Sequence, residues 1–500
     1  MKRTNLILTY LLPRLRDILF VGVCLSFLIR GPIIFSYDGD LGRHITVGNY
    51  ILTYQSFPTH DVFSHTRLGE RLVLHEWLAD IIFAFVHRFM GLDGAVLLAA
   101  LLAALTIWLV YEEIIRRGNY RLVAVIIAVC VTMVSIIHWL ARPHMFTFLL
   151  LAIWTYWLER FYTSDVRDIW KFPLLMLIWA NLHGAFFAGF IVWGAYAVDW
   201  IVEYRNGIKS MDSGKQLASI GILSFAATFI NPFGWQLWTT AVGYVGNDFM
   251  TSRIVDHLSP NFHNKETWFF LLMIVFALFA LMQDRRIRLR EALLLAGWIA
   301  MGLHTIRNLP LFAVVTAPIY GSILQTWAEK LPALKKQEVN LQKTESFLRG
   351  YVWIVSTVLL LGNVLWRGIP LDEKGVGNVF LPDKMPVRAV DWLEQNPQQG
   401  NLFNDFAWGG YILYRMWPKE VVFIDGQTDF YGETLFREYL DVISMNEGWE
   451  RILDGYDVSW MLVPTKGNLA RQLKRNQDDG WLVIYEDDTA TILRRESLSP

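Results

Sequence analysis

Near the N-terminus the sequence passes directly from an apolar segment into a charged one. Residues 20–44 read FVGVCLSFLIRGPIIFSYDGDLGRH. The first part is apolar enough to lie in lipid, whereas Asp38, Asp40, Arg43 and His44 follow it within a few positions. This pattern is typical of a membrane helix that ends at a polar surface. It raises the question of what two carboxylates, an arginine and a histidine do at that surface.

The whole chain has the composition of a multi-spanning membrane protein. Of its 500 residues 54% are hydrophobic, 22 are tryptophan, and the formal net charge is −1. Soluble proteins of this length are less apolar, and the near-neutral charge argues against nucleic-acid binding. Cys24 and Cys130 lie inside apolar runs, which argues against a disulfide framework or a thiolate metal site. The basic N-terminal flank lacks a small-residue cleavage site, so we expect a retained first helix.

Eleven apolar segments predict a polytopic α-helical membrane protein with an extracytoplasmic first loop. The predicted spans are 18–37, 95–115, 122–140, 145–162, 172–182, 185–202, 217–230, 268–282, 292–304, 309–327 and 351–366. A cytoplasmic N-terminus places six Lys/Arg clusters on the cytoplasmic side, as the positive-inside rule requires. The same topology places all eleven histidines in outer loops or at outer helix ends. Segment 38–44 therefore lies outside.

The composition changes after Trp366, which predicts two domains. Residues 1–366 form a transmembrane domain with a long first outer loop at 38–94, and 367–500 form an extracytoplasmic domain. In the second domain, strand-like runs alternate with helix-like ones, which predicts a small α/β fold. The expected strands are NLFND (401–405), VVFIDG (421–426), VSWMLVP (458–464), WLVIYEDD (481–488) and TATILRR (489–495).

Two stretches resemble a known family. Residues 37–113 place an acidic loop, the interfacial helix HEWLADIIFAFVHRFMG and an apolar span in the order seen in the first loop of GT-C glycosyltransferases. They are most similar to the protein O-mannosyltransferase and lipid A aminoarabinose transferase branch. In that branch the acidic pair is adjacent, whereas here Gly39 separates the two aspartates. Residues 404–431, NDFAWGGYILYRMWPKEVVFIDGQTDFY, resemble the signature region of the oligosaccharyltransferase catalytic subunit without its double tryptophan.

The resemblance implies a membrane glycosyltransferase in a bacterial-type plasma membrane. Such an enzyme moves a hexosyl or pentosyl group from a polyprenyl-phosphate sugar to an extracytoplasmic glycan, lipid or protein acceptor, with a partner subunit in some assemblies. Asp38 or Asp40 would take the proton of the acceptor, because a hydroxyl is not ionised near pH 7. The departing phosphate gains charge and needs cations beside it. The outer candidates are Arg142, His144, His304 and Arg307, followed by Arg43 and His44.

Further candidates and alternatives remain open at this point. His75, Glu76 and Asp425 are additional candidates, although His75 and Glu76 could instead form a polar pair at the junction of the loop and the bundle. A divalent cation would bind at Asp38 and Asp40 if the enzyme uses one. The aspartates could instead cap a helix that begins near Leu41, and the arginines could anchor helices to lipid headgroups. A non-catalytic GT-C-like assembly or binding subunit is the alternative function. A transporter fits less well, because the spans are almost free of central charge.

Overall fold

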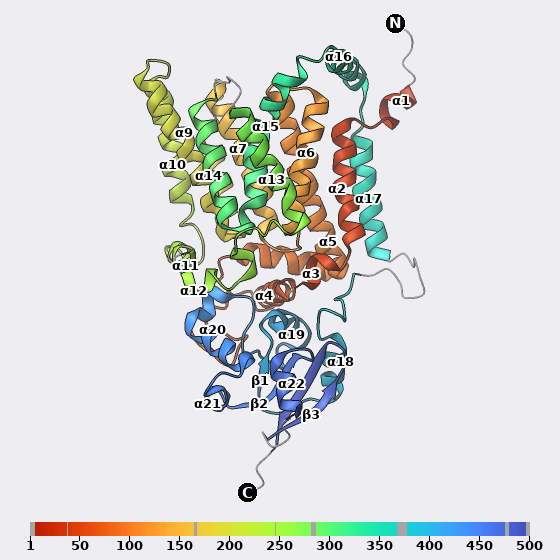
Figure 1. Cartoon of the computed structure of the whole chain (residues 1–500), viewed down its shortest axis with the longest axis vertical. Coiled ribbons are helices and arrows are strands. Elements are labelled where there is room, and N and C mark those ends of the chain that lie inside the picture. Colours follow the sequence, from red (N-terminus) through yellow and green to blue (C-terminus); the bar gives the residue numbers. More distant parts are fainter. Residues whose placement is uncertain are drawn as a thin grey trace. The chain divides into compact units, whose positions relative to one another are not determined.

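The computed structural model describes residues 6–37, 39–164, 168–245, 247–281, 287–367, 378–475 and 480–496, which belong to two compact units (Figure 1). The unit called helical here consists of Met1–Ile29, Val96–Gly234 and Thr251–Val376. The unit called mixed consists of Arg30–Ala95, Trp235–Met250 and Gly377–Pro500. The first loop and the C-terminal residues therefore belong to one compact unit.

Each predicted span coincides with helix in the structure. The helices concerned are α2 (Leu15–Arg30) with α3 (Ile33–Ser36), α5 (Trp77–Arg116), α6 (Arg121–Ser135), α7 (His144–Thr163), α8 (Lys171–Leu182), α9 (Phe187–Arg205), α10 (Met211–Ala227), α13 (Trp268–Leu281), α14 (Leu289–His304), α15 (Leu309–Ala328) and α17 (Tyr351–Arg367). In the helical unit most of them run side by side as a bundle (Figure 1). Helix α5 contains a break at Gly91, whose φ of 60° is accessible to glycine. The break separates the expected interfacial segment from the expected span.

Four of these helical segments are long and apolar enough to cross a membrane by length and composition. They are Trp77–Arg116, Arg121–His138, Gly184–Arg205 and Ile306–Ala328. A fifth is reached if the bent pair of α16 (Pro332–Phe347) and α17 counts as one span. Several other helices are shorter, for example α8 with 12 residues and α13 with 14. The total of eleven spans therefore stays a prediction.

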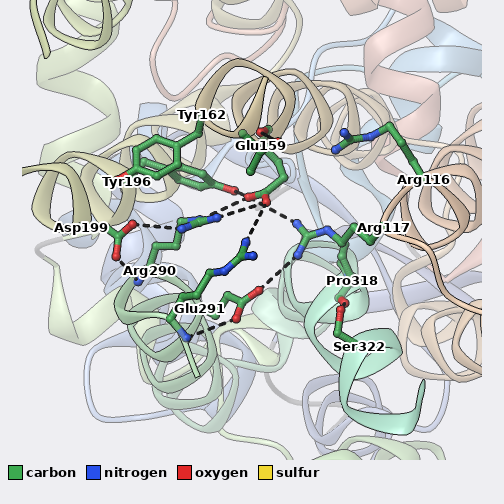
Figure 2. A network of polar contacts seen from close by, with 12 residues as sticks. Arg116, Arg117, Glu159, Tyr162, Tyr196, Asp199, Arg290, Glu291, Pro318 and Ser322 are labelled. Carbon is green, nitrogen blue, oxygen red and sulfur yellow. Dashed lines mark hydrogen bonds and ion pairs between the residues drawn. The ribbon is translucent and has the colours of Figure 1, made fainter. Parts of the chain in front are cut away.

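At one end of the helical bundle, Arg117 and Arg290, which belong to two of the six Lys/Arg clusters, take part in a buried ion-pair network (Figure 2). Arg290 lies within 3.3 Å of Glu159 and 3.1 Å of Asp199, and its side chain is only 3% exposed. Arg117 lies 2.8 Å from Glu113 and also contacts Glu159 and Glu291. Since these residues come from α5, α7, α9 and α14, the network joins the ends of four helices.

The mixed unit contains a four-stranded sheet of order β1-β2-β4-β3. Its strands are β1 (Asn401–Asn404), β2 (Val458–Pro464), β3 (Trp481–Glu486) and β4 (Ala490–Arg495). Strands β1 and β2 are parallel, and the other neighbours are antiparallel. Its helices are α4 (Asp40–Tyr54), the start of α5, α11 (Gln236–Val245), most of α12 (Asp248–Thr251), α18 (Val387–Gln395), α19 (Gly409–Met416), α20 (Thr428–Ser444), α21 (Trp449–Gly455) and α22 (Asn468–Arg475).

The prediction of a strand at VVFIDG is wrong. Val422 forms only an isolated bridge with Ser64 of the first loop. The Val422 N–H donates to the Phe63 carbonyl at 3.0 Å, and the His65 N–H donates to the Val422 carbonyl at 3.1 Å. The apolar run is buried as a strand would be, but its backbone partner is the first loop and not the sheet.

Helix α4 packs closely on two neighbours through glycines. A Cβ added at Gly42 would overlap the Gly410 carbonyl of α19, and a Cβ at Gly48 would overlap the Asp80 carbonyl of α5. Any larger residue would push these helices apart. The glycines of the first loop and of the WGGY stretch therefore bring α4, α5 and α19 together.

Candidate functional site

Asp40 is the first residue of α4, and its carboxylate lies against the backbone of Gly426. A Cβ added at Gly426 would overlap Asp40 Oδ1, so only glycine leaves room for the carboxylate. The N-cap of α4 is Gly39, and Asp40 is the first helical residue after it. The interpretation of Asp40 as the N-cap is therefore wrong. Asp38 lies outside the described residues.

Arg43 is held by the two residues on either side of Gly426, which are Asp425 and Gln427. Its Nε lies 3.1 Å from Asp425 Oδ2, and its Nη2 donates to the Gln427 side chain. Asp425 in turn accepts a hydrogen bond of 2.8 Å from the Gln427 N–H. Burial disfavours the charged guanidinium, but Asp425 and neighbouring acids outweigh it and raise the pKa of Arg43. Arg43 is thus a fixed cation whose main partner is already present.

His44 and His75 are connected through carboxylates at the start of α5. His44 Nδ1 lies 2.6 Å from Asp80 Oδ1, and its Nε2 lies 3.8 Å from Glu76. His75 lies 3.8 Å from Glu76 and 3.4 Å from Asp429. Burial disfavours charged His44, but the hydrogen bond and charge of Asp80, with Glu76 and Asp40, raise its pKa above the usual range.

These contacts define one cluster, called the α4 site here. It consists of Asp40, Arg43, His44, His75, Glu76, Asp80, Asp425, Gln427 and Asp429. The structure thus brings together six residues that the sequence singled out. Asp80, Gln427 and Asp429 were missed, although Asp80 follows Glu76, and Asp429 follows Asp425, at a spacing of four. The site offers carboxylates that can accept a proton beside one fixed guanidinium.

The described residues give no arrangement of three His, Cys, Asp or Glu side chains that could hold a metal ion. Asp38, one half of the pair considered for a divalent cation, lies outside those residues.

A second cluster lies in the helical unit and contains three of the predicted phosphate-binding residues. Arg142, just before α7, lies 3.7 Å from Asp256, and Arg307 of η5 (Ile306–Asn308) lies 3.1 Å from His257 Nε2. His144 Nε2 lies 2.8 Å from the His138 carbonyl. We call these residues the arginine–histidine cluster: His138, Arg142, His144, Asp256, His257 and Arg307.

The pKa shifts in the arginine–histidine cluster indicate an excess of positive charge. Burial lowers the pKa of Arg142 to about 10, with Arg307 adding to the effect and Asp256 opposing it. Burial and Arg307 lower the pKa of His257 to about 4. For Asp256, Arg142 and its neighbours outweigh burial and lower the pKa to about 2. One carboxylate therefore faces two guanidinium groups, an arrangement that suits an anion.

The predicted cations are divided between the two units. Arg43 and His44 belong to the α4 site, whereas Arg142, His144 and Arg307 belong to the arginine–histidine cluster. His304 ends α14 with an exposed side chain, and its carbonyl accepts from the Ser259 hydroxyl at 3.2 Å. Arg142 has a side chain only 13% exposed and faces Asp256, which differs from the exposed headgroup anchor considered above.

Comparisons with known proteins give structural but no sequence matches. No family model and no curated protein matches the sequence. The fold is similar to the oligosaccharyltransferase AglB of Archaeoglobus fulgidus in complex with an inhibitory peptide and a dolichol-phosphate, with a TM-score of 0.60 and 12% identity over 97% of this chain and 74% of that one. It is also similar to ArnT of Cupriavidus metallidurans bound to undecaprenyl phosphate, with a TM-score of 0.50 and 14% identity over 97% and 99% of the two chains. Both are GT-C superfamily membrane glycosyltransferases. The chain therefore shares the fold of these two proteins.

Proposed function

We propose that this chain is an integral membrane glycosyltransferase that moves a sugar from a polyprenyl-phosphate donor to an extracytoplasmic acceptor, with Asp40 as the base. The observation that carries the proposal is the α4 site. The first loop and the 425–429 segment are far apart in sequence, yet the Asp40 carboxylate lies against Gly426 and the Arg43 guanidinium pairs with Asp425. The titles of the similar structures name dolichol-phosphate and undecaprenyl phosphate, which supports a lipid phosphate as the donor.

The proposed reaction inverts the anomeric carbon in one displacement. Asp40 takes the proton of the acceptor hydroxyl while the acceptor oxygen bonds to the anomeric carbon. The bond from that carbon to the phosphate oxygen breaks, and its electron pair stays on the phosphate. Cations stabilise the charge that the phosphate gains, and the sequence candidates for this role are Arg142, His144 and Arg307. Arg43 has Asp425 as its partner and therefore serves to position the loop rather than to bind the phosphate.

The membrane topology belongs to the proposal. Eleven spans, a cytoplasmic N-terminus and an extracytoplasmic domain from 367 onward follow from the charge pattern of the loops. A reporter active only in the cytoplasm, fused at Pro500, should be silent. Cytoplasmic activity of this fusion would contradict the orientation and move the acceptor to the other side.

The test of the catalytic role is the substitution Asp40→Asn. An amide keeps the shape of the carboxylate but cannot accept the proton, so transfer should fall ~10²–10⁴-fold while donor binding stays. Asp391→Asn is the matched control, because Asp391 is an exposed aspartate of the same unit. Sugar transfer and melting temperature are measured on purified protein. Normal turnover in the Asp40→Asn variant would refute the role of Asp40 as the base.

One observation favours a second candidate, a non-catalytic GT-C-like subunit. Arg43 and His44 are both buried and paired with carboxylates, as in a network that serves the fold. In that case Asp40→Asn would leave any activity of the assembled complex unchanged, whereas disruption of the Arg43–Asp425 pair would release the chain from its partner. Co-purification of the Asp425→Asn variant with the complex distinguishes the two functions.

A further inference from the structure

Helix α16 has one face that is tied to the helical unit by its two acidic residues. Arg121 Nη1 lies 2.5 Å from Glu338, and Arg121 Nε lies 2.7 Å from Glu345. The backbone N–H groups of Arg121 and Leu15 also donate to Glu338 and Glu345, each at 2.8 Å. These bonds fix the rotation of α16 about its own axis.

Because both glutamates point inward, the charge left on the exposed face is positive. Lys335, Lys336 and Lys343 are exposed, and the other charged residues of the helix are the two tied glutamates. Val339 is 43% exposed and Phe347 is 62% exposed. Lys335, Val339, Lys343 and Phe347 are spaced by four residues and so share one side of the helix. Lysines thus alternate there with apolar side chains.

The neighbouring helix indicates how this face lies. Helix α17 is apolar, with Val355, Leu359 and Leu360 all more than half exposed, as in a helix that faces lipid. The axes of α16 and α17 differ by 68°. If α17 crosses the bilayer, α16 therefore runs closer to the bilayer plane than to its normal. Tyr351 and Trp353 are exposed at the start of α17, and aromatic residues are enriched at the membrane interface.

We propose that α16 is an interfacial helix that binds anionic lipid headgroups through Lys335, Lys336 and Lys343. The interleaved Val339 and Phe347, with Leu331 just before the helix, enter the boundary between headgroups and acyl chains. Lysines beside a membrane surface are attracted by anionic lipids. Binding to a soluble acidic protein would explain the lysines but not the apolar residues between them, nor the position beside a lipid-facing helix. The inference is independent of sugar transfer.

The test uses the full chain in nanodiscs of phosphatidylcholine, with or without phosphatidylglycerol. An environment-sensitive fluorophore is attached at Val339→Cys after Cys24 and Cys130 are replaced with alanine. We expect a blue-shifted emission and strong quenching by a lipid-attached quencher, both greater with phosphatidylglycerol. Replacement of Lys335, Lys336 and Lys343 with glutamine should remove the difference between the lipids, and replacement with glutamate should reverse it.

A matched control replaces two exposed lysines elsewhere in the helical unit, Lys215→Gln and Lys265→Gln, and should keep the lipid difference. The same emission in both lipids would overturn the proposal. Quenching of the probe by an aqueous quencher but not by the lipid-attached one would also overturn the proposal. That result is expected if this surface binds a soluble protein.

Discussion

The carboxylate of Asp40 lies so close to Gly426 that a Cβ at residue 426 would overlap Asp40 Oδ1. This contact joins the first residue of α4 to a turn of the C-terminal part of the mixed unit. Replacing Gly426 with alanine adds a methyl group at this contact without changing any charge, and so tests the position of Asp40.

Gly426→Ala should displace Asp40 and lower sugar transfer by about 10²-fold, since a displacement of about 1 Å can cost that much. Gly455→Ala is the matched control, because a Cβ at Gly455 meets no other atom within 4 Å. Initial rates and melting temperatures of both variants are compared with the unaltered chain. A Gly426→Ala variant with a full rate would show that the position of Asp40 does not matter for transfer.

The pair of His44 and Asp80 should make stability depend on pH. The folded-state pKa of His44 is raised above 6.5, so the charged pair stabilises the fold fully below pH 6.5. This contribution is lost as pH rises through the raised pKa. The melting temperature of the unaltered chain should therefore exceed that of His44→Gln at low pH, with a difference that shrinks above pH 6.5. The exposed His60→Gln is the control, and a difference that does not vary with pH would contradict the ion pair.

The arginine–histidine cluster should govern affinity for the donor phosphate. Arg142→Ala and Arg307→Ala should each weaken donor binding, and Arg142→Lys should restore it only in part, because an ammonium lacks the planar fork of guanidinium. Asp256→Asn should bind the donor at least as tightly, since it removes the carboxylate that faces Arg142. Isothermal titration with a polyprenyl-phosphate sugar measures these affinities.

Arg253→Ala is the control for these variants, because Arg253 is exposed in the same segment as Asp256. Unchanged affinity in both Arg142→Ala and Arg307→Ala would show that the two arginines do not bind the donor phosphate.

The ion-pair network of Figure 2 should contribute to stability rather than to transfer. Arg290→Met leaves Glu159 and Asp199 buried with less compensating charge, which typically costs about 3–5 kcal/mol. Arg288→Met is the matched control, because Arg288 also faces Glu159 but has a side chain 58% exposed. A drop in melting temperature for Arg290→Met alone is expected. Equal melting temperatures of the two variants would contradict the importance of burial.

Hydropathy was sufficient to predict the helices, because apolar length is a local property of the sequence. The predicted spans coincide with helices, and the GT-C resemblance of residues 37–113 is confirmed at the level of the fold. The strand at VVFIDG was predicted wrongly because its partner is Phe63 to His65 of the first loop. No local pattern indicates that a run from the C-terminal part pairs with a loop more than 350 residues earlier.

Only part of the α4 site could be predicted for the same reason. Asp40, Arg43 and His44 stand out because charge directly follows an apolar run. Asp80 lies inside an amphipathic helix and Asp429 at the start of another, where acidic residues are ordinary. Their importance appears only when the glycine contacts of α4 bring the three segments together. The catalytic roles of all these residues stay predictions.

The mixed unit combines an early and a late part of the chain, so its site cannot form early in synthesis. Arg43 emerges from the ribosome early, whereas its partner Asp425 is separated from it by 382 positions. During most of translation the first loop therefore carries a guanidinium without its final carboxylate, and Asp40 has no Gly426 to lie against. A nascent chain that stops before residue 425 holds every candidate of the first loop but lacks Asp425, Gln427 and Asp429. The α4 site can therefore form only after the 425–429 segment has been synthesised and has folded onto α4.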